Sequence, residues 1–227
     1  MVWLIFIGSA AVIVLAATQL ARFGDAIAVR TRLGGMFVGT LLLAGATSLP
    51  ELLTTISSLR QGVPNLAAGN MLGSNMFNMF MLAVLDMLFR QERILRRVAT
   101  HHALTASLAT LLIGTAAFFI LADIDVSIGW VGADSLVLLG IYVAGVQQIR
   151  SANSAAAAEP AAEAELEGVP RLPLALAGFL AAAGVLVLVT PELVSSSAEI
   201  AEMTGLGAGF VGTTLVALVT SLPELVT

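Results

Sequence analysis

Cysteine and lysine are both absent from this chain of 227 residues, and only 11% of its residues are charged. Without cysteine the chain has neither a disulfide framework nor a thiolate metal site. In a typical soluble domain about a quarter of the residues are charged. Hydrophobic residues make up 58% of this chain. The net charge of −5 comes mostly from one acidic segment. The composition therefore indicates a membrane protein and gives no sign of a nucleic-acid partner.

Long apolar stretches make up most of the chain. A helix needs about twenty apolar residues to cross a bilayer, and in lipid it satisfies its own backbone hydrogen bonds. The pattern predicts an all-α polytopic membrane protein with about seven spans, near residues 3–21, 34–59, 64–89, 102–122, 127–148, 172–191 and 205–227.

The arginine residues predict the orientation in the membrane. All of them except Arg60 lie in alternate loops, at Arg22, Arg30, Arg32, Arg90, Arg93, Arg96, Arg97, Arg150 and Arg171. The positive-inside rule assigns such loops to the cytoplasm. We therefore expect a multi-pass protein of the plasma (inner) membrane, with the N-terminus outside and the Ala/Glu-rich linker 150–171 in the cytoplasm.

A duplicated segment is the most informative feature. Residues Phe37–Thr54 recur almost unchanged as Phe210–Thr227, and both copies contain Thr-Ser-Leu-Pro-Glu, which ends at Glu51 or Glu224. In the predicted topology one copy enters the membrane from the cytoplasm and the other from outside. Such an inverted-topology repeat is typical of secondary transporters.

The repeat predicts how the chain is divided. Residues 1–149 form a first half of five helices with the complete first motif, and 150–171 form the acidic linker. Residues 172–227 form an incomplete second half that ends within the second motif.

The repeated motif places chemistry at membrane depth. An acidic side chain there is costly and by default marks a functional site. Pro50 has no N–H for the carbonyl of Ala46, so we expect the helix to kink or unwind near Ala46–Leu49. Freed carbonyls would then join the hydroxyls of Thr47 and Ser48 and the carboxylate of Glu51. The alternative is a proline-kinked helix whose Glu is paired elsewhere, and two inverted copies make it less favourable.

The next span carries a matching polar face. Asn70, Ser74 and Asn78 are spaced by four and share one side of a helix. Counted from the turn near residues 61–64, Glu51 and Ser74 both lie roughly 16 Å deep. Small residues at Gly69 and Gly73 predict close approach between this helix and the helix of Glu51. The alternative, polar residues that only join helices, does not require this match in depth.

All these candidate ligands bind through oxygen: carboxylate, hydroxyl, amide and backbone carbonyl. This set suits hard cations such as Ca²⁺, Na⁺ or Mg²⁺ rather than copper or zinc. No cofactor is expected, and the bound ions would be transported ions. Nothing in the chain resembles a nucleophile with its base or a zinc motif, so an enzyme is not favoured.

The motifs resemble the calcium/cation antiporter superfamily, in particular the prokaryotic sodium/calcium exchanger membrane domain. The resemblance rests on Gly45-Ala46-Thr47-Ser48-Leu49-Pro50-Glu51, on Gly69-Asn70, Gly73-Ser74-Asn75 and Asn78, and on Thr213-Thr214 with Thr220-Ser221-Leu222-Pro223-Glu224. It implies an inverted-repeat fold of ten helices, of which about seven are present here, around a cluster of cation sites. It also implies the ligands Ala44, Thr47, Ser48, Glu51, Ser74, Asn78, Ala217, Thr220, Ser221 and Glu224.

The resemblance implies a secondary active antiporter that exchanges Ca²⁺ for Na⁺ by alternating access. Two alternatives stay open: a Ca²⁺/H⁺ exchanger of the same fold, and a C-terminally truncated, non-transporting fragment. The family continues beyond the second Pro-Glu helix, so we expect missing C-terminal helices to complete the site. The expected partners are Ca²⁺, Na⁺ or H⁺, and the lipid bilayer.

Overall fold

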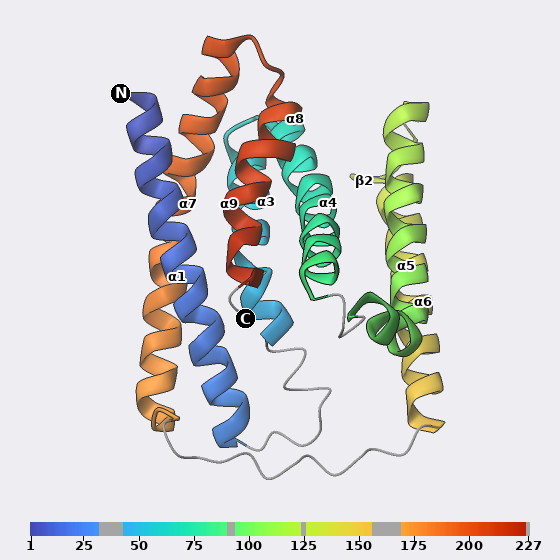
Figure 1. Ribbon diagram of the computed structural model, residues 1–227. Helices are drawn as coiled ribbons and strands as arrows, with labels where there is room; N and C mark the ends of the chain where they lie inside the picture. Colours follow the sequence, from blue (N-terminus) through green and yellow to red (C-terminus); the bar gives the residue numbers. More distant parts are fainter. Residues whose placement is uncertain (32–42, 90–93, 124–125, 156–168, 226–227) are drawn as a thin grey trace. The chain divides into compact units, whose positions relative to one another are not determined.

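The computed structural model describes residues 1–31, 43–89, 94–123, 126–155 and 169–225 (Figure 1). Apart from one two-residue strand pair, the regular structure in these ranges is helical. Two compact units divide the chain: residues 1–81 with 161–227, and residues 82–160. The first unit thus combines segments from both predicted halves. The expected division into 1–149, 150–171 and 172–227 follows the repeat instead, and it stays a prediction.

The first unit is built on a pair of long helices, α1 (Val2–Thr31) and α7 (Leu172–Thr204). They run antiparallel and pack against each other (Figure 1). Fully buried aliphatic side chains such as Leu20 on α1 and Leu186 on α7 form the core between them. At one end, the guanidinium of Arg30 donates to the backbone carbonyls of Val169 and Pro170, which fastens α1 to the start of α7.

The first copy of the motif contains the predicted break in a helix. Residues 43–47 are helical, Ser48 forms a turn, and α3 (Leu49–Arg60) begins directly after it. Pro50 lies in the first turn of α3, where the missing N–H costs no helical hydrogen bond. The expected interruption near Ala46–Leu49 is therefore confirmed at Ser48. Residues 34–42 of the expected span 34–59 lie outside the described residues.

The second copy breaks its helix differently. After α8 (Ala208–Val211), the backbone widens to a π-helix (η1, Gly212–Val216) and returns to an α-helix (α9, Ala217–Ser221). It then tightens to a 3₁₀-helix (η2, Leu222–Leu225) that contains Pro223. Single π turns inside helices occur frequently at functional sites.

The helix α4 (Pro64–Leu88) supplies the glycine face that the sequence analysis singled out. A Cβ on Gly73 would lie 2.5 Å from the carbonyl oxygen of Thr213 and 2.8 Å from the Cβ of Ala217. A Cβ on Gly69 would likewise overlap the backbone of Gly209. The glycines were expected to allow close approach to the helix of Glu51. Instead they allow α4 to touch the helix of the second motif.

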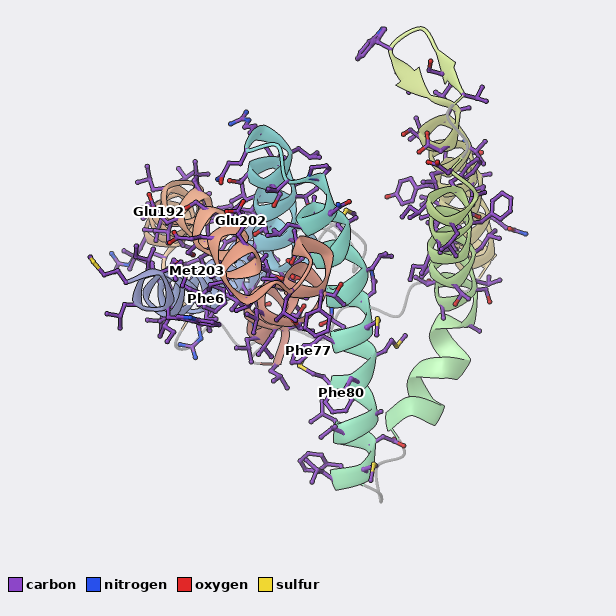
Figure 2. All side chains as sticks on the ribbon, turned by 90° about the horizontal axis from the view of Figure 1, so that it is seen from above. Phe6, Phe77, Phe80, Glu192, Glu202 and Met203 are labelled. Atoms are coloured by element: carbon purple, nitrogen blue, oxygen red, sulfur yellow. The ribbon has the colours of Figure 1, made fainter. Side chains whose placement is uncertain are left out.

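Farther along α4, beyond this contact, apolar side chains are exposed. Met76, Met79 and Phe80 are all more than half exposed, and Figure 2 shows Phe80 and Phe77 extending from this helix. A helix with apolar side chains on its uncovered side suits a lipid or helix neighbour rather than water.

The second unit consists mainly of α5 (Ile94–Ala122) and α6 (Ala133–Ala155). Between them, β1 (Ser127–Ile128) and β2 (Val131–Gly132) form a two-residue antiparallel pair around Gly129. At Gly129 φ is 70°, which suits glycine. Gly145 on α6 lies against Leu108 on α5, so these two helices pack closely.

Five described helices are long and apolar enough to cross a membrane, at Val2–Thr31, Pro64–Leu88, Ala103–Ala122, Leu172–Thr204 and Ala208–Leu225. They correspond to five of the seven expected spans. The expected span 34–59 lies partly outside the residues that the structure describes. The expected span 127–148 begins with the strand pair, so only the shorter apolar helix Ala133–Ile149 corresponds to it.

Gly73→Ala tests the close contact between α4 and the second motif. The added methyl group would overlap Thr213 and Ala217, so we expect the free energy of unfolding to fall by about 1–3 kcal/mol. Thermal unfolding of the purified protein measures this loss. Gly8→Ala on α1 is the control, because nothing lies within 4 Å of its added Cβ. Equal unfolding temperatures for both variants would contradict the contact.

Candidate functional site

Glu51 is the centre of the candidate site. It lies in the first turn of α3, directly after the break at Ser48. Both its carboxylate oxygens are buried. Its electrostatic neighbours are the carboxylate of Glu224 and the hydroxyls of Thr220 and Ser221. The two copies of the motif therefore meet at their acidic residues.

The hydroxyl of Thr220 joins α9 to α4. It donates to Oδ1 of Asn70 over 3.2 Å and lies 3.2 Å from Oγ of Ser74. Asn70 and Thr220 are fully buried, and Ser74 is 5% exposed. Three buried polar side chains from segments far apart in the sequence thus form one network beside Glu51.

The other predicted ligands of the second motif lie in the same helix segment. Ala217 is fully buried, and its carbonyl faces the hydroxyl of Thr220 at 3.4 Å. Ser221 is fully buried, and its Oγ has no hydrogen-bond partner among the described residues. Glu224 is half-buried in the 3₁₀ turn, where it contributes to the charge around Glu51.

The predicted ligands of the first motif are less enclosed. The hydroxyl of Thr47 donates to the carbonyl of Ala44 over 3.1 Å, and the amide of Ser48 donates to the same carbonyl. Ala44 and Ser48 are exposed. Asn78 on α4 is half-buried, and its Oδ1 has no hydrogen-bond partner among the described residues. Ser74, by contrast, lies 3.2 Å from the hydroxyl of Thr220 in the second motif.

Asn70 was not among the predicted ligands, although the spacing of four placed it on the face of Ser74. The signal that could have identified it is the glycine on either side of this turn, Gly69 and Gly73. Glycines bring two helices close together, so a polar side chain between them is forced against the neighbouring backbone. Sequence spacing alone does not reveal that this neighbour is the second motif.

The charge around Glu51 is acidic. Among the groups that shape the electrostatics of Glu51, the described residues contribute no basic side chain. They also contain no cluster of three or more His, Cys, Asp or Glu residues that could hold a metal. A cation here would therefore bind to two carboxylates supplemented by hydroxyl and amide oxygens. Such neutral and acidic oxygens are ligands of Ca²⁺, and carboxylates and carbonyls also suit Mg²⁺.

These features define a multi-pass membrane protein with a buried acidic site between two copies of one motif. A family model described as sodium/calcium exchanger protein matches residues 1–146 and 174–227. The chain belongs to the sodium/calcium exchanger family. It is thus a member of a transporter family and not an enzyme.

Two curated relatives share shorter segments. The sodium/calcium exchanger MaX1 of Methanosarcina acetivorans is 50% identical over 52 residues, which cover 23% of this chain and 15% of the relative. CaxA of Alkalimonas amylolytica, described as a candidate antiporter, is 40% identical over 86 residues, which cover 37% of this chain and 25% of the relative. The matched segments are thus a minor part of each relative. No solved structure is significantly similar to the chain.

Glu51→Gln tests whether the site is built for a cation. Neutralising Glu51 removes its repulsion from Glu224 and a costly buried charge. The melting temperature without Ca²⁺ should therefore stay equal or rise, while stabilisation by added Ca²⁺ is lost. Thermal unfolding with and without Ca²⁺ measures both effects.

Glu192→Gln is the matched control, because Glu192 also follows a proline but is exposed on α7 (Figure 2). This variant should keep the response to Ca²⁺. A marked loss of stability in Glu51→Gln without Ca²⁺ would indicate a structural partner for Glu51 instead of an ion.

Proposed function

We propose that this protein is a secondary active antiporter that exchanges Ca²⁺ for Na⁺ across the plasma (inner) membrane by alternating access. One observation carries the proposal: Glu51 and Glu224, from two copies of one motif, share a buried site lined by hydroxyls. The family and the name of MaX1 agree with it.

The energetics of the site support exchange rather than an open channel. A carboxylate at the bilayer centre costs at least about 2.5 kcal/mol, and the described groups that shape the electrostatics of Glu51 include no basic side chain. A bound cation offsets this cost. The site is therefore stable in a closed state when it is loaded, and much less so when it is empty. If the site can change from one side of the membrane to the other only when a cation is bound, the flux of one cation is coupled to the flux of the other.

The proposed ligands are those of the two motifs. Glu51 and Glu224 would supply carboxylates, Thr47, Ser48, Ser74, Thr220 and Ser221 hydroxyls, Asn78 an amide oxygen, and Ala44 and Ala217 carbonyls. The exposure of Ala44 and Ser48 supports a ligand shell that is completed by further protein or by water.

A Ca²⁺/H⁺ exchanger of the same fold is the second candidate. It is favoured by the same pair of neighbouring carboxylates, because such a pair can carry protons as well as cations. A fragment that binds a cation without transporting it is the remaining alternative.

Transport is tested in proteoliposomes that are loaded with Na⁺ and placed in Ca²⁺ without external Na⁺. We expect uptake of Ca²⁺ that stops when the Na⁺ gradient is abolished. Glu51→Gln should reduce the initial rate at least about tenfold, since the loss of one ligand charge exceeds 1.4 kcal/mol, and Glu192→Gln should transport like the parent.

Uptake that follows a pH gradient and ignores Na⁺ would favour the proton-coupled candidate. Binding of Ca²⁺ without uptake would favour the non-transporting alternative. Sodium-driven uptake by Glu51→Gln at the parent rate would contradict the proposal itself.

Orientation is tested by single cysteines, which the cysteine-free chain makes unambiguous. Arg60 and Arg171 are both exposed, and the positive-inside rule puts them on opposite sides. Arg60→Cys in intact cells should react with a membrane-impermeant maleimide, and Arg171→Cys only after permeabilisation. The reverse pattern would contradict an outside N-terminus.

A further inference from the structure

The hairpin between α5 and α6 carries a tryptophan at its tip. Trp130 is 97% exposed, and Val126 at the base of the hairpin is more than half exposed. Figure 2 shows this hairpin projecting from the ends of the two helices. A tryptophan buries about 150–250 Å² where it has a partner. The described residues leave nearly all of this surface uncovered, so the hairpin presents a large apolar group for a contact outside its own unit.

The backbone of the hairpin fixes the position of this side chain. Pairing of β1 with β2 leaves Gly129 and Trp130 as a two-residue turn. At Gly129 φ is 70°, whereas Trp130 has no positive φ, and this combination is typical of a type II′ turn. The amide of Ala133, where α6 begins, donates to the carbonyl of Val126 over 2.8 Å. This bond closes the base of the hairpin, so Trp130 is held a fixed distance from the start of α6.

The tip of the hairpin lies within reach of the lipid headgroups. The apolar part of α5, Ala103–Ala122, has 20 residues and is about 30 Å long, which equals the thickness of the hydrocarbon core. Ala122 therefore lies near the boundary of the core, where a headgroup layer of roughly 5–7 Å begins. The base and the tip of the hairpin are about three residues apart, or about 10 Å. A hairpin that leans along the membrane surface thus places its tip in the headgroup layer.

The surface next to the hairpin favours lipid as the partner of Trp130. Leu121 in the last turn of α5 is 85% exposed, and Leu136 in the first turn of α6 is also exposed. Exposed apolar side chains thus occur on both helix ends as well as on the hairpin. Tryptophan has an apolar ring and one N–H donor, and for this reason it is enriched where acyl chains meet headgroups and water. The lipid interface satisfies both parts of this side chain at once.

We propose that this hairpin is a membrane anchor whose Trp130 inserts into the headgroup layer of the bilayer beside α5 and α6. Movement of the helix pair along the membrane normal would take the indole out of this layer, so the anchor fixes the depth of the pair. The proposal needs only a chain embedded in a membrane and is independent of which ions are transported.

Tryptophan fluorescence tests the anchor, because the chain has only 2 tryptophans. Trp3→Phe leaves Trp130 as the sole tryptophan of the full chain. The purified variant is reconstituted into phosphatidylcholine vesicles that carry a nitroxide either near the headgroup or near the end of the acyl chain. We expect the nitroxide near the headgroup to quench Trp130 several-fold more strongly than the deeper one. Iodide on both sides of the membrane should quench it only weakly, because an inserted indole is shielded from water.

Glu202→Trp, combined with Trp3→Phe and Trp130→Phe, is the control, because Glu202 is an exposed charged residue near the end of α7 (Figure 2). The introduced side chain should be quenched strongly by iodide and weakly by either lipid label. The same pattern for Trp130 would overturn the proposal, since the hairpin would then stand in water. Stronger quenching of Trp130 by the deeper label would also overturn it. Protection from iodide and from both labels would overturn it as well and would indicate a protein partner, such as a second copy of the chain.

Discussion

The close contact between α4 and the helix of the second motif is the constraint on which the rest of the site depends. Glycines at positions 69 and 73 let the backbones approach to a distance that any Cβ would prevent. The same contact places Asn70 and Ser74 against Thr220, and Thr220 beside Glu51. In a membrane, where lipid is as apolar as leucine, such packing of small residues and interhelical hydrogen bonds replaces the hydrophobic effect as the cause of association.

Polarity inside this contact is costly, which is informative about its purpose. The described part of the site includes two neighbouring carboxylates and a buried amide, Asn70, whose Nδ2 has no hydrogen-bond partner among the described residues. Each is a penalty that an apolar helix pair would avoid. Two repeats that each supply a carboxylate to one place form an acidic site whose cost a bound cation would offset. In the proposed mechanism, the cost of the empty site is what couples the two fluxes.

Much of this could be predicted from the sequence because the chemistry is local and duplicated. The apolar runs predicted helical spans, and proline after Thr-Ser-Leu predicted the break that occurs at Ser48. The family was recognised from two Pro-Glu motifs and the Gly-Ser-Asn helix and is confirmed. Three-dimensional partners could not be predicted, since no local pattern shows that Gly73 faces Thr213 or that Asn70 binds Thr220. The π turn at Gly212–Val216 could not be predicted either, because nothing in its sequence distinguishes it from an α-helical segment.

The most direct test of the account is a crystal structure of the protein with Ca²⁺, in which anomalous scattering locates the ion. The account predicts one ion bound by oxygens of both Glu51 and Glu224, at the roughly 2.3–2.6 Å typical of Ca²⁺. An ion bound by only one of the two motifs, or by neither, would contradict the claim that the two repeats build a single site.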